Sequence, residues 1–260
     1  MNFKKCTFIS FLVVLICFLC SCNKDENKQP NIEVSSIGNT GIQIAETEYG
    51  ETRFVCVNGS SVDKIVSGNP HIGDAVSIDG YYYVFNKIAI QKGKYEPKED
   101  LDGWSVISMK EDRATTDGII ENLFGKDVKS MNYCFYGHQN IKELKEIPKT
   151  IESADSAFIF CSGLKTVSFS SEKLTNANRM FLHCEKLETV ENLPDSIVEA
   201  DSMFRYCLSL KGRVYIPQNI KYFNNIFEKT ENVIRITGSS EKIQYICEAY
   251  NNVFEYREKT

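Results

Sequence analysis

Apolar positions in the second half of the chain recur at a fixed interval of 23 residues. The clearest column consists of phenylalanines, namely Phe135, Phe158, Phe181, Phe204 and Phe227. Phenylalanine is 16 of the 260 residues, so four successive matches at one interval have a chance probability of about 10⁻⁵ per starting position. This register indicates an internal structural repeat.

Other columns keep the same register as the phenylalanines. Three residues after them stand His138, Cys161, Cys184, Cys207 and Thr230. Nine residues after them stand Leu144, Val167, Val190, Arg213 and Ile236, in which Arg213 is the exception to the apolar pattern. A unit of 23 residues cannot bury its apolar side alone, whereas stacked coils turn each column into a ladder inside a solenoid. We therefore expect five to six coils spaced by about 4.8 Å where they pair as strands.

Each repeat predicts a short strand followed by a return path. In the coil that begins at Leu187, the first six residues suit a strand and Pro194 ends it, because proline donates no ladder hydrogen bond. Residues Ile197 to Ala200 then return across the coil. Asp201 and Ser202, placed before Met203, indicate a capped helical turn.

The repeats resemble a known family. Met180-Phe181-Leu-His-Cys184-Glu-Lys-Leu187 and Met203-Phe204-Arg-Tyr-Cys207-Leu-Ser-Leu210 are similar to BspA-type leucine-rich repeats, which follow a Phe-x-x-Cys-x-x-Leu pattern. The similarity covers residues 131–250, with residues 251–260 as a C-terminal cap or tail. It implies a mainly β fold, and a bacterial surface protein that binds or adheres to other molecules.

The stretch before the repeats predicts a small antiparallel β region over residues 41–110. Runs of alternating polarity include 53–57, 81–85 and 104–109. Asn58-Gly59 and Asp79-Gly80 follow or precede such runs and are strong hairpin signals. Residues 111–130, with a possible short helix over 119–124, are expected to cap the first coil, because solenoids need covered ends.

The N-terminus has the pattern of an export signal. Lys4 and Lys5 precede an apolar run over residues 8–20, which is shorter than the roughly 20 residues of a spanning helix. Leu19-Cys20-Ser21-Cys22 resembles a bacterial lipobox, which implies a signal peptide over residues 1–21 and acyl chains such as palmitate on Cys22. The alternative is an ordinary signal cut near Ser21, which leaves Cys22 as a plain thiol.

Residues 22–40 are polar and predict a flexible tether between the membrane and the folded part. Asn23 and the following Lys24-Asp25-Glu26 resemble the acidic export tag of some outer-membrane lipoproteins. The resemblance implies an outer-membrane location with exposure at the cell surface.

Composition and charge narrow the function classes. The formal net charge is −5 with a pI of about 5.4, and no basic run is present, which argues against a nucleic-acid partner. We find no Ser/His/Asp grouping, phosphate-binding glycine loop or metal-ligand spacing in the sequence, so we expect neither an enzyme nor a cofactor.

The cysteine column permits three interpretations. A metal site is disfavoured because equivalent positions run along a line, whereas Zn–S bonds of about 2.3 Å require ligands around a point. Disulfides between adjacent coils are compatible with distance, but laddered side chains point in parallel. The favoured interpretation is a buried ladder of thiols.

Two surfaces are candidates for binding. Residues of the repeat strands that do not face the core are expected to form an outward face: Lys142, Glu143, Lys145, Lys165, Thr166, Glu188, Thr189, Lys211, Tyr215 and Arg235. Its mixed charge favours a protein ligand, although a plain solvated face is equally compatible with each residue. Tyr82 and Trp104 could instead form a sugar-stacking platform in the β region, with packing as the alternative role.

Overall fold

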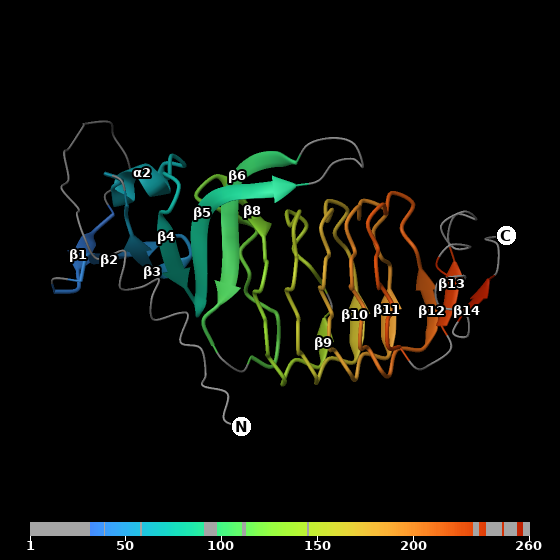
Figure 1. Ribbon diagram of the computed structural model, residues 1–260. Coiled ribbons are helices and arrows are strands. Elements are labelled where there is room, and N and C mark those ends of the chain that lie inside the picture. Colours follow the sequence, from blue (N-terminus) through green and yellow to red (C-terminus); the bar gives the residue numbers. More distant parts are fainter. Residues whose placement is uncertain are drawn as a thin grey trace, which may run out of the picture. The chain divides into compact units, whose positions relative to one another are not determined.

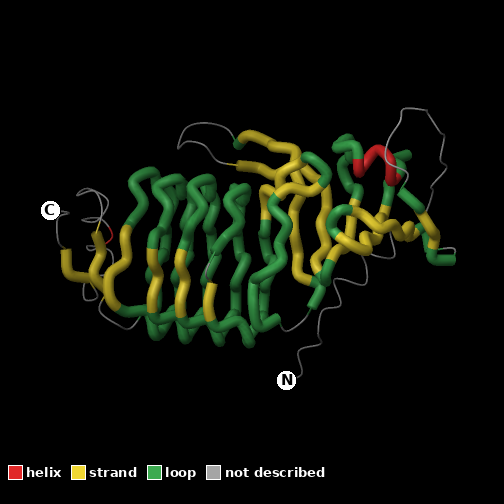
Figure 2. The backbone as a smooth tube through the Cα atoms, turned by 180° about the vertical axis from the view of Figure 1, so that it is seen from behind, coloured by secondary structure: helices red, strands yellow, loops and turns green. Residues whose placement is uncertain are grey.

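A computed structural model describes residues 32–38, 40–57, 59–90, 98–110, 113–144, 146–230, 234–237, 246 and 254–256. The chain divides into two compact units, residues 1–86 and residues 87–260. Strand β5 (Tyr81–Ile90) crosses the boundary between them. Strands make up nearly all the regular structure of the described residues (Figure 2), which confirms the predicted mainly β fold.

The first unit is an antiparallel meander. Its elements are β1 (Val34–Ser36), β2 (Ile42–Thr47), β3 (Gly50–Val55), α2 (Val62–Val66), β4 (Ala75–Ile78) and the start of β5. Each strand pairs with the next one along the chain. Asp79 and Gly80 form the predicted two-residue turn between β4 and β5, with φ angles of 48° and 76°, because this turn needs positive φ at both positions.

Our prediction of a tight hairpin at Asn58-Gly59 is wrong. Strand β3 does pair with β4, but the connection between them contains helix α2. Ser61 caps this helix by accepting a hydrogen bond from the backbone nitrogen of Lys64, and Val62 and Ile65 are buried. A capped turn with two buried residues therefore replaces the tight hairpin. Asn58 itself lies outside the described residues.

The second unit begins with β6 (Glu99–Ser108), β7 (Asn122–Leu123) and β8 (Lys126–Ser130), which are ordered β6-β8-β7. The short helix expected over residues 119–124 is absent. Phe124 and Gly125 have φ angles of 50° and 75°, which form a tight turn between the antiparallel strands β7 and β8. Ser130 then bridges to Ser153, so β8 leads directly into the solenoid.

The repeats form stacked coils, each with one short strand (Figure 1). The strands are β9 (Glu143–Leu144), β10 (Thr166–Ser168), β11 (Thr189–Glu191), β12 (Gly212–Tyr215), β13 (Ile234–Thr237) and β14 (Phe254–Tyr256). They pair in parallel within two sheets, β9-β10-β11 and β12-β13-β14. A second parallel strip of single bridges joins Ser130, Ser153, Asn176, Glu199 and Tyr222.

The phenylalanine column forms the core of the solenoid. Phe135, Phe158, Phe181, Phe204 and Phe227 are buried, and successive ring centroids lie 5.2, 5.6, 5.7 and 5.6 Å apart. The rings are nearly parallel, with interplanar angles between 7° and 19°. The predicted ladder is therefore confirmed.

The irregular residue Arg213 is explained by a local shift of strand β12. Gly212 has a φ of 85°, a conformation that glycine adopts easily. After it, Val214 is fully buried while Arg213 is exposed. The core position thus moves by one residue, and the apolar column continues through Val214.

Our prediction of a helical turn after Asp201 is wrong. Ser202 and Tyr206 have φ angles of 57° and 61°, which no right-handed helix contains. The segment is a series of tight turns, in which backbone nitrogens also reach the neighbouring coil. For example, the nitrogen of Phe204 donates to the oxygen of Ile226 at 2.9 Å.

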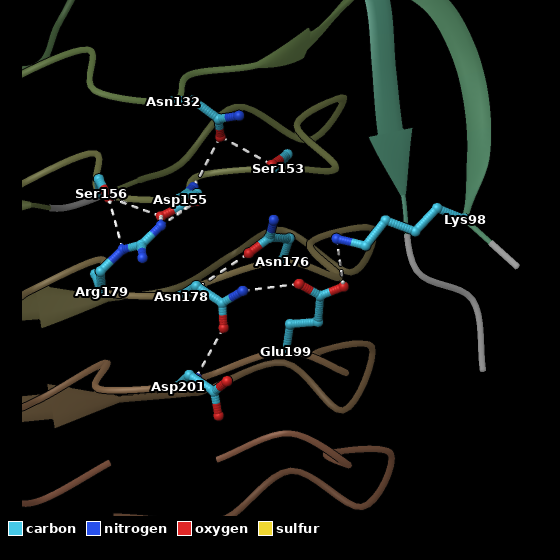
Figure 3. A network of polar contacts seen from close by, with 10 residues as sticks. All are labelled: Lys98, Asn132, Ser153, Asp155, Ser156, Asn176, Asn178, Arg179, Glu199 and Asp201. Carbon is cyan, nitrogen blue, oxygen red and sulfur yellow. Dashed lines mark hydrogen bonds and ion pairs between the residues drawn. The ribbon is translucent and has the colours of Figure 1, made fainter. Parts of the chain in front are cut away.

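A column of asparagines and aspartates stitches the coils together (Figure 3). Its members are Asn132, Asp155, Asn178 and Asp201, which Figure 3 labels, and Asn224. The side-chain oxygen of Asn178 accepts a hydrogen bond from the backbone nitrogen of Asp201 at 2.8 Å. The side-chain oxygen of Asn132 accepts one from the backbone nitrogen of Asp155 in the same way. Asn178 also donates to the buried carboxylate of Glu199, to which Lys98 adds an ion pair of 3.3 Å. These side chains satisfy backbone groups at the turns.

Candidate binding groove

The predicted binding face lies on the strands of the solenoid. Lys142, Glu143, Lys165, Thr166 and Lys211 are exposed, whereas Glu188, Thr189 and Tyr215 are half-buried. Lys145 and the side chain of Arg235 lie outside the described residues. Parallel pairing aligns Glu143 with Thr166 and Thr166 with Thr189, so equivalent side chains form rows across successive coils.

In the later coils, the side chains of this face bind one another. The ammonium of Lys211 lies 2.6 Å from Glu188, and this hydrogen bond and charge lower the pKa of the Glu188 carboxyl. Tyr215 donates to Asp195 at 2.9 Å, and its pKa is raised first by burial and then by that bond. These residues are therefore less available to a ligand than Lys142 and Lys165.

A groove covers the near part of the same face. It has a volume of about 1090 Å³, and its lining combines the loop 114–121 with residues of the first two coils. Four residues of the predicted face belong to this lining, namely Lys142, Glu143, Lys165 and Thr166. The structure thus brings part of the predicted face into a concave site.

The loop that forms the wall is held to the coils at its C-terminal end. The carboxylate of Glu121 accepts a hydrogen bond from the backbone nitrogen of Lys149 at 2.7 Å. The backbone oxygen of Glu121 accepts one from the hydroxyl of Thr150 at 3.1 Å. Near the start of the loop, the guanidinium of Arg113 donates to the oxygen of Asp117 at 3.1 Å. This wall was missed as a binding element in the sequence, where the segment carries no repeat signal and was expected only to cap the first coil.

The chemistry of the groove is polar and mixed in charge. Its lining contains the lysines 142, 149 and 165 and the acidic residues 117, 121, 143 and 146, and no aromatic side chain. Pockets for small apolar ligands are lined mainly by hydrophobic and aromatic groups and have volumes of about 300–1,000 Å³. The groove is better suited to a polar chain that presents amides and charged groups.

The predicted sugar platform is contradicted at Trp104. This side chain is fully buried and its indole nitrogen donates to the oxygen of Leu123 at 3.0 Å, so no sugar can stack on it. Tyr82 is half-buried, and burial raises its pKa, while its neighbours Tyr81 and Tyr83 are fully buried. Packing is the role of the tryptophan because a buried indole needs both apolar contact and a hydrogen-bond acceptor.

Exposed and half-buried aromatic side chains lie instead on the turns of successive coils. Phe160 stacks on His183 at 4.9 Å, and His183 stacks on Tyr206 at 4.3 Å between ring centroids. Tyr136 meets Phe160 edge to face at 5.7 Å. The periodic spacing of Phe160, His183 and Tyr206 was visible in the sequence, but their mixed residue types concealed the column.

The cysteine column forms the predicted ladder of buried thiols. The thiols of Cys161, Cys184 and Cys207 donate to carbonyl oxygens of the preceding coil at 3.1, 3.1 and 3.2 Å. All three are fully buried, and burial raises the pKa of each, to about 12 for Cys161. His138 takes this position in the first coil, where its Nε2 lies 2.6 Å from the oxygen of Lys110.

One serine, histidine and aspartate do meet in the first unit, which the sequence did not indicate. Ser60 contacts the Nδ1 atom of His71, but the Asp74 carboxylate accepts from the backbone nitrogens of Val57 and His71. A catalytic triad needs the carboxylate on the imidazole ring. Ser60 is also buried, so this cluster is a structural connection between loops.

These features define a class of protein, a leucine-rich-repeat solenoid with a laddered core. The model of the BspA type leucine rich repeat region matches residues 129–259 in six copies, and the chain belongs to this family. Such repeat domains are non-enzymatic scaffolds typical of protein binding and adhesion.

The crystal structure of the T. pallidum leucine rich repeat protein has a TM-score of 0.40 and 13% identity, over 67% of this chain and 97% of that chain. No match was found among curated proteins. In the described part of the chain, no helix is long and apolar enough to cross a membrane. Cys22 and the signal segment lie outside that part.

Proposed function

We propose that this chain is a cell-surface lipoprotein whose repeat solenoid binds a protein partner in the groove between loop 114–121 and the first two coils. The observation that carries the proposal is the groove itself, because it joins predicted face residues with a second, pinned wall. Its polar lining offers hydrogen bonds and charges of both signs, which suits a polypeptide segment.

The binding part is tested by peptide-display selection against the full chain, followed by measurement of affinity for the enriched peptides. We expect Thr166→Trp, which fills the groove with a large side chain, to abolish binding. Lys173→Trp is the matched control, because Lys173 is exposed and does not line the groove. Peptides that bind equally to both variants would refute the assignment of the site.

The lipid part has a separate test. Acyl chains contribute about 0.8 kcal/mol per buried CH₂ group, so a doubly acylated cysteine holds a protein on a bilayer. We expect incorporation of labelled palmitate that is lost in Cys22→Ser and retained in Cys20→Ser, together with protease accessibility on intact cells. Labelling that persists in Cys22→Ser would contradict the lipobox assignment.

A further inference from the structure

Two lysines on the floor of the groove form an unusual pair. Lys142 and Lys165 occupy equivalent positions on adjacent coils, and the backbone nitrogen of Lys165 donates to the Lys142 oxygen at 2.7 Å. Both side chains are exposed. Among the described residues, no carboxylate lies within ion-pair distance of either ammonium.

The equivalent residue of the next coil, by contrast, has a partner of opposite charge. Glu188 follows Lys165 by one coil, but it is held by Lys211 at 2.6 Å. Like charges on neighbouring coils repel each other, and the charge of Lys165 acts on Glu188 only at longer range, without a direct ion pair. A carboxylate placed between Lys142 and Lys165 would offset their repulsion.

The other residues that line the groove restrict the kind of ligand that can carry this carboxylate. Asp117, Glu121, Glu143 and Glu146 lie in the same groove and would repel a ligand with negative charge along its whole length. The absence of aromatic lining removes the stacking surface that sugars favour. A peptide with a local acidic side chain satisfies both conditions, and its amides can reach the polar side chains around it.

We propose that the groove selects an extended peptide segment of the partner protein whose acidic side chain lies between the ammonium groups of Lys142 and Lys165. This inference rests on the proposed function and specifies its ligand. The carboxylate replaces the missing counter-charge, while the acidic wall disfavours further negative charge along the segment.

The test uses fluorescence polarisation with the full chain and three labelled peptides of about 12 residues, each about 40 Å long when extended at about 3.3 Å per residue. The peptides share one Ser/Thr/Val/Gly sequence and carry Asp, Asn or Lys at the central position. We expect the Asp peptide to bind about tenfold more tightly than the Asn peptide, since two exposed ion pairs contribute up to about 1 kcal/mol each.

Charge reversal provides the decisive control. The variant with Lys142→Glu and Lys165→Glu should prefer the Lys peptide, and Lys173→Glu should leave the order of affinities unchanged. Because all three lysines are exposed, these variants should keep the thermal midpoint of the parent protein. Equal binding of the Asp and Asn peptides, or an unchanged preference after charge reversal, would overturn the inference.

Two further measurements distinguish failure of the acidic preference from failure of the proposed binding function. A sulfated oligosaccharide that binds through the lysine pair, while the Asp peptide does not bind, would overturn the inference in favour of an anionic glycan. If display-selected peptides occupy the groove without regard to charge, the proposed function stands and the acidic preference fails. If no peptide is sensitive to Thr166→Trp, both fail together.

Discussion

The thiol of Cys161 should make the protein less stable at alkaline pH by a predictable amount. The thiol is fully buried and donates to the oxygen of Phe135 at 3.1 Å, and burial raises its pKa from 9.0 to about 12. A raised pKa means that the folded protein holds the proton more tightly than the unfolded chain. The resulting stability is fully present below pH 9 and is lost progressively as pH rises towards 12.

The magnitude follows from linkage, at about 1.4 kcal/mol for each pH unit between the two pKa values. Between pH 8 and pH 10.5, the Cys161 thiol should therefore account for a loss of about 2 kcal/mol in the free energy of unfolding. Cys161→Ala removes this titration, although it also removes packing at every pH. The informative quantity is therefore the change between the two pH values and not the absolute stability.

The measurement is urea unfolding of the parent protein and Cys161→Ala at pH 8 and pH 10.5. Lysine and tyrosine titrations affect both proteins equally and cancel in the comparison. The parent should lose about 2 kcal/mol more than the variant. Equal losses would show that the thiol does not hold its proton in the folded state, and would refute the buried-ladder account of this residue.

Three other substitutions test the packing of the coils by urea unfolding at neutral pH. Gly163→Ala should cost more than about 2 kcal/mol, because the new Cβ would lie 2.0 Å from the oxygen of Gln139. Gly212→Ala, with open space around it, should cost only the strain of positive φ, about 1 kcal/mol. The reverse order would contradict the close approach of the two coils at Gly163. Asn178→Ala should cost about 2 kcal/mol through unsatisfied groups at Asp201 and Glu199, and a neutral effect would argue against the polar ladder. Phe181→Ala should cost about 3–5 kcal/mol, since its ring stacks between two others; a loss below about 1 kcal/mol would be incompatible with that core.

Periodicity made the solenoid predictable from the sequence. The 23-residue register of Phe135 to Phe227 identified the core, the coil length and the inward direction of the cysteines, because each coil repeats the same local path and buries the same positions. The exception at Arg213 arose from the backbone shift at Gly212, which a fixed spacing cannot represent.

Local signals without a repeat were weaker guides. Asp79-Gly80 formed its turn, while Asn58-Gly59 did not form a hairpin, since the stability of a turn depends on which strands are available to pair beside it. Phe124-Gly125 formed a turn where a helix was expected. The first case reflects the pairing of β3 with the more distant β4, and the second reflects the local pairing of β7 with β8 across the turn.

The candidate site divides in the same way. Lys142, Glu143, Lys165 and Thr166 could be assigned to the outward face because the repeat register places the buried positions at Leu144 and Val167. The groove could not be predicted, since it depends on loop 114–121, which is held by Glu121 against Lys149 and Thr150 far along the chain. The burial of Trp104 likewise depends on its long-range bond to Leu123. Repetition fixes the coil through contacts that recur at one spacing, whereas the shape of the binding surface comes from contacts that occur once.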